Sequence, residues 1–392
     1  MYENHHSELL YLYFGGFPPG ESRVVGQRRR LLVLCPYPLG VAAGQRLKFE
    51  QYFDDWRVNG WEVVASPFMG DGLWSSAFVR GKLAAKAIGV FKGYLRRLRD
   101  LARTRQFDLV YVFMYVTPIG SSMMERATRT LARKLVYDIE DNVMALFQGV
   151  GENHPNPLLH FFRGSEKYRY LIREADHVVT SSPTANEHCE AINRRGGCTY
   201  ISSSLDADRF VPAYRYSNDD VVTIGWTGTF STRRYLDLLS GVLQKLARER
   251  RFRLRVIGNF DYELPGVDLE VVRWSEEREV ADLRAIDIGL YPLSLDNWVS
   301  GKSGLKAIQY MMMGIPCVAT DVGTTPLIIR DGENGLLARS EDDWLNALTR
   351  LLDDWELRRR LGEAARHDAV EKYSTKAIAA QYRNVLAEVM ES

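Results

Sequence analysis

The chain of 392 residues is long enough for two domains, each with its own hydrophobic core. Its composition, 46% hydrophobic and 26% charged, is that of a globular protein, and a formal net charge of +1 argues against a nucleic-acid partner. No run reaches the roughly 18 uninterrupted apolar residues of a membrane span, and the first residues lack the order of a signal peptide. We therefore expect a cytoplasmic protein whose four cysteines, none in CxxC spacing, stay reduced.

Short apolar runs alternate with helical segments through the first half of the chain. We expect strands at Leu31–Cys35 and in the segments WEVVASPF, FDLVYVFM, RKLVYDIED and ADHVVTSSP. Amphipathic stretches such as QRLKFEQYFDDWRVNG and GSEKYRYLIREA lie between them. This alternation is typical of a parallel sheet with helices on both faces.

The same rhythm restarts after a polar, turn-rich segment. Further strands are predicted in VVTIGWTGTF, FRLRVIGNF, LEVVRW, DIGLYPL and PCVATD. We therefore expect an α/β chain with two Rossmann-like, doubly wound domains, at residues 1–211 and 221–370, joined by a linker at 212–220. A terminal helix at 371–392 either stays with the second domain or crosses back to the first. Ligands of such sheets bind at the carboxyl ends of the strands.

A helix predicted at about Gly304–Met313 begins just after the DIGLYPL strand and its loop. Four residues lie at or before its first turn: Lys302, Ser303, Gly304 and Leu305. The free amides of a helix N-terminus bind anions, and Lys302 adds a positive charge, so we expect a diphosphate here. Gln309, one turn further on, could hydrogen-bond a hydroxylated group attached to that phosphate. The alternative is that Lys302 and Lys306 are only solvated surface charges.

The segment GLKAIQYMMMGIPCVATDVGTTPLIIRDGENGLLA resembles the donor-site signature of the retaining GT-B glycosyltransferases of family 4, also called group 1. Similar segments include IGWTGTFSTRRYLDLL, LRAIDIGLYPL and SLDADRFVP, and the resemblance covers most of residues 31–338. It implies a hexosyltransferase that needs no cofactor, and we expect no metal to be needed, because helix amides and cationic side chains would bind the diphosphate. Such an enzyme moves a sugar, with retention, from a UDP- or GDP-linked donor to a glycan, a lipid-linked or a small-molecule acceptor. We expect such an enzyme to take part in polysaccharide biosynthesis.

Two acidic residues of the family pattern are missing. The resemblance places Gln309 where the family has the Glu that binds the ribose hydroxyls. It places Gly301 where the family has the Glu that contacts the transferred sugar. Asp296, in the same loop, either replaces the Glu that contacts the transferred sugar or has a turn or capping role.

The phosphate-binding pair of the family is also altered. After Gly228, Thr229 stands at the Arg position and Arg234 at the Lys position of the Arg-x4-Lys pattern. We therefore expect Arg234 and Lys302 to stabilise the negative charge that develops on the departing diphosphate, a catalytic role for Lys302.

The first domain is expected to close the site from the other side. Gly44 follows the first strand and could bring its backbone close to the diphosphate, while Arg46 could contact phosphate or acceptor, or lie on the helix surface. Glu140 and Asp141 end the segment RKLVYDIED, at the carboxyl end of its strand, and are the carboxylates that could orient an acceptor hydroxyl or stabilise positive charge on the sugar. One of them could instead cap the next helix.

The segment Arg80–Arg105 holds nine Lys or Arg residues and one acid, Asp100. Its apolar residues recur at helical spacing, so it is either an ordinary surface helix or a peripheral contact with the anionic inner face of a membrane. In the second case the lipid headgroups would meet a set of basic residues that includes Lys92, Arg96, Arg97 and Arg99.

Two other functions fit the same pattern. A GT-B sugar-nucleotide epimerase would release UDP without an acceptor and would need acid and base groups at the anomeric carbon. A non-catalytic nucleotide-sugar-binding subunit is favoured by the changes at Gly301 and Gln309 and would bind donors without turnover.

Overall fold

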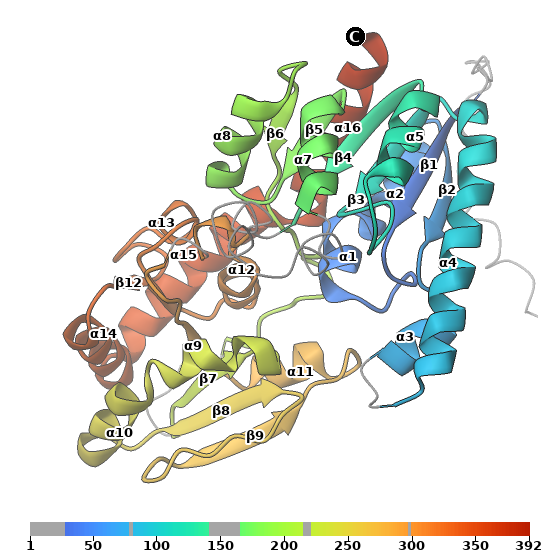
Figure 1. Ribbon diagram of the computed structural model, residues 1–392. Coiled ribbons are helices and arrows are strands. Elements are labelled where there is room, and N and C mark those ends of the chain that lie inside the picture. The colour runs from blue at the N-terminus through green and yellow to red at the C-terminus, as the bar shows by residue number, and fades with distance from the viewer. Residues whose placement is uncertain (1–27, 78–80, 141–164, 215–220, 297–298) are drawn as a thin grey trace, which may run out of the picture.

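The computed structural model describes residues 28–77, 81–140, 165–214, 221–296 and 299–392. In this part of the chain, two six-stranded parallel sheets form separate layers (Figure 1). The first has the order β2-β1-β3-β4-β5-β6 and the second the order β12-β11-β10-β7-β8-β9. Each sheet starts at an inner strand and grows in both directions, which confirms the predicted pair of doubly wound domains.

The strands of the first sheet are β1 (Arg29–Cys35), β2 (Trp61–Pro67), β3 (Leu109–Phe113), β4 (Lys134–Asp138), β5 (His177–Thr180) and β6 (Cys198–Tyr200). Those of the second are β7 (Thr223–Thr227), β8 (Arg253–Gly258), β9 (Leu269–Arg273), β10 (Ile288–Tyr291), β11 (Cys317–Thr320) and β12 (Leu336–Ala338).

The helices that accompany the first sheet in sequence are α1 (Ala43–Lys48), α2 (Phe53–Val58), α3 (Asp71–Ala77), α4 (Leu83–Arg103), α5 (Met123–Leu131), α7 (Ser165–Glu174) and α8 (Pro183–Ile192). Those that follow are α9 (Arg233–Asp237), α10 (Ser240–Glu249), α11 (Glu279–Arg284), α12 (Leu305–Met312), α13 (Thr325–Ile328), α14 (Glu341–Asp353), α15 (Trp355–Tyr373) and α16 (Thr375–Glu391).

Strand β1 shows why an inner strand contains an unbroken apolar run. Leu31 and Val33 point into one hydrophobic core, whereas Leu32 and Leu34 point into another on the opposite face of the sheet. Successive side chains of a strand alternate between faces, so a strand covered on both sides needs an unbroken apolar run.

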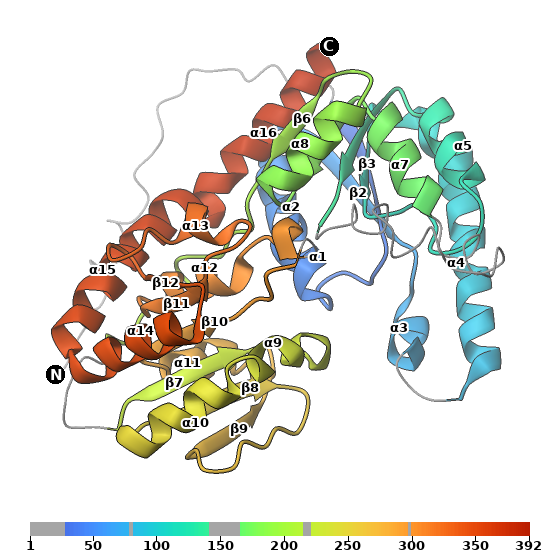
Figure 2. The same ribbon diagram turned by 60° about the vertical axis from the view of Figure 1, so that its left-hand side comes forward.

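The last helix, α16, leaves the second domain and packs on the first sheet. Leu205 pairs with the chain at Ser374, where its backbone bonds Tyr373 and Thr375, and the Ser374 hydroxyl accepts from the Ala377 amide to cap α16. Five apolar residues of α16 that share a core with β1 are Ile378, Ala379, Val385, Leu386 and Val389. Figure 2 shows α15 and α16 running from one domain to the other.

The contact between α16 and the first sheet includes a cluster of buried polar side chains around Asp138. The Tyr382 hydroxyl donates to Asp138 Oδ2 over 3.4 Å, Tyr111 donates to the same oxygen, and Lys48 Nζ lies 3.8 Å from Oδ1. Burial raises the pKa of Asp138, and the positive charge of Lys48 opposes this rise.

We expect Tyr382→Phe to lower the free energy of unfolding by about 1 kcal/mol, because Asp138 loses one donor and keeps the others. Chemical denaturation followed by tryptophan fluorescence measures the change. Gln381→Ala, at an exposed position of the same helix, is the matched control and should stay within about 0.5 kcal/mol. Equal stability of Tyr382→Phe and the control would remove this hydroxyl from the interactions that hold α16.

Helix α4 stands at the outer edge of the first domain in both views (Figures 1 and 2). Its inner face carries Gly89 and Gly93, where a Cβ atom would overlap Leu73 and Phe68. Its large apolar residues face outward instead, and five of them are at least 49% exposed: Leu83, Ile88, Phe91, Leu95 and Leu98. The apolar stripe of this helix therefore does not cover the sheet.

The expectation that Arg97 meets lipid headgroups is wrong. Arg97 is fully buried and donates to the backbone carbonyls of Cys35, Ser66 and Val116 at 2.7–2.8 Å. Its guanidinium also pairs with Asp100 at 3.0 Å. The charge is retained in the interior because each of its three nitrogens has an acceptor.

Candidate active site

A pocket of about 270 Å³ opens at the carboxyl ends of β7 and β10. These two strands are neighbours, and the chain extends the sheet from β7 first through β8 and then, on its other side, through β10, so the pocket lies at the switch point. Both domains contribute to its lining, which comprises Gly44, Glu140, Thr232, Tyr235, Tyr291, Pro292, Leu293, Lys302, Ser303, Leu305 and Lys306.

The N-terminus of α12 forms one wall. Gly304 precedes the helix with a φ of 74°, and a Cβ atom there would overlap Ile328, so the position needs glycine. Lys302 lies beside it, with its carbonyl accepting from the Thr324 hydroxyl at 2.6 Å. The Lys302 ammonium is 5.8 Å from the centre of the Tyr235 ring. Predicted residues Lys302, Ser303 and Leu305 are thus brought together in the pocket.

A second lysine, Lys306, lines the same wall and was not among the predicted site residues. Its ammonium lies 4.4 Å from the centre of the Trp226 ring and 3.4 Å from the Thr232 hydroxyl. Loss of hydration lowers the pKa of Lys306 to about 7, with the charge of Lys302 adding to the effect. The available signal was its place in the first turn of the predicted helix, next to the N-terminus where an anion was expected.

Gly228 makes room for this lysine. A Cβ atom at Gly228 would lie 2.7 Å from Lys306 Nζ and would also overlap the Trp226 ring. The glycine after β7 is therefore needed for the approach of a charged side chain, in addition to any approach of a phosphate.

On the opposite side of the pocket, Gly44 of α1 faces Glu140, which follows β4. A Cβ atom at Gly44 would overlap the Glu140 carboxylate, so the two positions are in direct contact. Glu140 is half-buried and lines the pocket, as the sequence predicted for a residue at a strand's carboxyl end. Asp141, the other predicted carboxylate, lies outside the described residues.

Arg46 and Gln309 meet in a charged cluster and do not line the pocket. Arg46 pairs with Glu276 and lies 4.0 Å from Glu279, while Arg209 pairs with Glu279 at 3.2 Å. Gln309 donates to the same carboxylate of Glu279 over 3.3 Å. Burial raises the pKa of Glu279, and the two arginines oppose the rise. The cluster joins α1 of the first domain to α11 and α12 of the second.

Three further predicted residues have local partners and are not part of the pocket lining. Thr229 caps the short helical turn Phe230–Thr232, and Arg234 donates to the Tyr235 hydroxyl at 3.0 Å. Asp296 accepts from the Ser294 hydroxyl at 2.7 Å and from the Val299 amide at 3.3 Å, the geometry of a turn.

Among the described residues, one group has side chains close enough to share a metal ion: His367, Asp368 and Glu371 on α15. Asp368 already accepts from Asn334 and pairs with Arg330, both at 2.7 Å. None of these residues lines the pocket between the domains.

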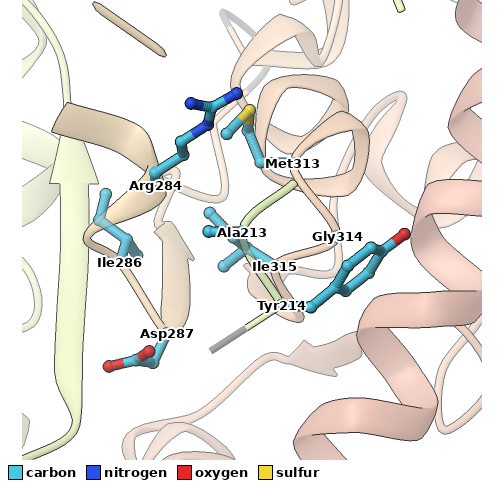
Figure 3. Close-up of a pocket in the computed structure, with 8 residues that line it drawn as sticks. All are labelled: Ala213, Tyr214, Arg284, Ile286, Asp287, Met313, Gly314 and Ile315. Carbon is cyan, nitrogen blue, oxygen red and sulfur yellow. The ribbon is translucent and has the colours of Figure 1, made fainter. Parts of the chain in front are cut away.

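Figure 3 shows a second pocket, which lies at the opposite end of the strands of the second sheet, next to the start of β10. Asp287 borders it and accepts from the Thr223 amide at 2.8 Å. Its volume of about 20 Å³ suits one water molecule and is too small for a nucleotide.

The described helices include none that is long and apolar enough to cross a membrane.

Residues 221–354 match the family model described as Glycosyl transferases group 1. A D-inositol 3-phosphate glycosyltransferase of Corynebacterium aurimucosum is 37% identical over 126 residues, which cover 31% of this chain and 28% of that protein. An N-acetyl-alpha-D-glucosaminyl L-malate synthase of Bacillus anthracis is 34% identical over 89 residues, covering 22% and 23%. The chain thus matches about a quarter of the length of these curated relatives.

Solved structures match over a larger part of the chain. The sucrose-phosphate synthase of Thermosynechococcus elongatus has a TM-score of 0.67 at 15% identity and covers 93% of this chain and 100% of its own. Anabaena HepE in complex with UDP and glucose has a TM-score of 0.61 at 14% identity and covers 92% and 100%. With its pocket at the switch point and its likeness to these solved structures, the chain has the GT-B fold, and its residues 221–354 are similar to the group 1 glycosyl transferases.

Proposed function

We propose that this protein is a retaining glycosyltransferase that moves a hexose from a UDP- or GDP-linked donor to a glycan, a lipid-linked or a small-molecule acceptor. The observation that carries the proposal is the pocket at the switch point, where Lys302, Lys306 and the N-terminus of α12 meet. Two ammonium groups and free helix amides suit a diphosphate. Anabaena HepE, solved with UDP-glucose, makes UDP-glucose the first donor to test.

The chemistry follows from the charge that develops on the leaving group. As the bond between the anomeric carbon and the diphosphate breaks, negative charge grows on the phosphate oxygens. Lys302, Lys306 and the α12 amides would stabilise that charge in place, without a large rearrangement of solvent. Glu140, on the facing wall, would orient an acceptor hydroxyl or stabilise positive charge on the sugar ring.

Donor hydrolysis and transfer assays test the proposal. UDP- and GDP-hexoses should raise the melting temperature, because a ligand that binds only the native state stabilises it. One of them should release nucleoside diphosphate together with a glycosylated acceptor from a glycan, lipid or small-molecule panel. Donor binding with no turnover would favour the non-catalytic subunit, and release of UDP with an epimerised sugar and no acceptor would favour the epimerase.

We expect turnover to persist in EDTA, because cationic side chains and amides supply the phosphate contacts. The rate with EDTA should stay within about twofold of the untreated rate, whereas losing a metal that stabilises the leaving group would remove several kcal/mol of transition-state stabilisation. A complete loss of turnover that Mg²⁺ or Mn²⁺ restores would contradict these metal-free phosphate contacts and would make Glu140 a candidate metal ligand.

We further propose that the enzyme works in the cytoplasm and docks reversibly on an anionic membrane surface through α4. The support is the exposed apolar stripe on α4 together with the exposed basic residues Lys82, Lys92 and Arg99 beside it. The one acid of the helix, Asp100, is buried and paired with Arg97 and Arg103. An apolar stripe flanked by positive charge matches the interface of an anionic bilayer and would bring the enzyme to a lipid-linked acceptor.

A further inference from the structure

The amino group of Lys306 lies in the proposed diphosphate site, and its contacts in the described structure carry no charge. These contacts are the face of the Trp226 ring and the hydroxyl of Thr232. Trp226 is almost fully buried, and its ring covers one side of the Lys306 amino group. Gly228 has no side chain that would overlap the nitrogen of Lys306. The side chain is therefore held at the pocket wall by packing rather than by a carboxylate.

Three charged groups line the pocket or lie on the elements that form it. Lys302 precedes the same helix and repels it, and Arg234 lies on α9 with its guanidinium on the Tyr235 ring. Glu140 reaches the pocket from the first domain. The position at Thr229, where the family resemblance expects an arginine, carries a hydroxyl that serves in a local cap. The second domain thus lacks a phosphate-binding cation at Thr229 and carries an additional cationic residue at Lys306.

We propose that Lys306 replaces the missing cation at Thr229 and takes up a proton from the solvent when a nucleoside diphosphate binds. The inference rests on the proposed function, because it concerns the donor site. One N–H bond forms on the neutral amine as a buffer acid in the solvent gives up its proton and becomes its conjugate base, and the resulting ammonium pairs with the diphosphate.

The sign of the pH effect follows from linkage. In the empty site the pKa of Lys306 is lowered to about 7, so at pH 8 most molecules carry a neutral amine. A bound diphosphate favours the ammonium and raises this pKa again. Affinity should therefore be full below pH 7 and should fall as pH rises above 7, because each binding event must then add a proton. The terminal phosphate of UDP, with a second pKa near 6, is already largely ionised between pH 7 and pH 9, where the fall in affinity is expected.

Titration calorimetry of the whole protein with UDP tests the proposal. At pH 8, the binding enthalpy is measured in phosphate-free buffers of different ionisation enthalpy. Its slope against the buffer's ionisation enthalpy should correspond to uptake of about 0.9 proton per UDP. Between pH 7 and pH 9, the affinity should fall by roughly 10- to 50-fold. Lys306→Arg carries a fixed charge and should bind UDP with a flat pH profile and no uptake. Lys302→Arg is the matched control and should keep the uptake.

A binding enthalpy that is the same in all buffers, together with a flat pH profile in the unmodified protein, would overturn the proposal while leaving the donor site intact. Absence of binding of both UDP and GDP at every pH would instead overturn the proposed function. The buffer series uses the unmodified protein, so it decides the matter even if Lys306→Arg fails to fold.

Discussion

Replacing both Lys302 and Lys306 by alanine is expected to weaken binding of UDP or GDP by about 3–6 kcal/mol, or roughly 10²- to 10⁴-fold. Each ammonium would make charge-assisted hydrogen bonds to phosphate oxygens worth about 1.5–3 kcal/mol. Lys302 precedes α12, Lys306 lies in its first turn, and both line the same wall of the pocket. Calorimetry or competition binding at pH 7 and fixed ionic strength measures the loss.

A matched variant separates a specific site from general electrostatics. Lys245 is an exposed residue of α10 that does not line the pocket, so Lys245→Ala should leave UDP and GDP affinity unchanged. The double variant should also bind uridine about as weakly as the unmodified protein does, because uridine has no phosphate. If the double variant retains full UDP and GDP affinity, the pocket at the switch point is not the diphosphate site.

Substituting Ile88, Phe91 and Leu95 with serine is expected to reduce binding to anionic vesicles by about 10²- to 10³-fold. These side chains are 49–63% exposed in the free protein, so burial in a bilayer interface would add about 1 kcal/mol or more for each. Sedimentation with vesicles that contain phosphatidylserine measures the effect, and neutral vesicles should bind the unmodified protein much less. UDP binding should not change, because α4 does not contribute to the pocket lining.

A charge variant tests the electrostatic part of the same contact. Lys92→Gln with Arg99→Gln should cost about 1 kcal/mol for each residue at low salt and less at high salt. Arg97 must be left in place, since its removal would leave Asp100 buried without that partner. If no variant binds less than the unmodified protein, or if the serine substitutions instead dissolve a dimer seen by analytical ultracentrifugation, α4 is not a membrane contact.

Local patterns were sufficient for the architecture and for one wall of the site. Parallel strands covered on both faces need unbroken apolar runs, and helices between them need amphipathic periodicity, so both sheets could be predicted from the chain. The N-terminus of α12 was also predictable, because a strand, a loop with Lys302 and Gly304, and a helix follow one another directly. An anion site of this kind depends on backbone geometry that neighbouring residues determine.

The surroundings of individual charged side chains could be known only from the tertiary structure. Lys306 meets Trp226 and Thr232, more than seventy residues earlier in the chain. The burial that lowers its pKa, together with the charge of Lys302, depends on how such distant segments pack around it. Arg97 and Lys92 lie on one helix in the same basic run, yet packing buries the first and exposes the second. Periodicity along a chain specifies which face a residue occupies, whereas hydration and partners depend on which distant segment packs against that face.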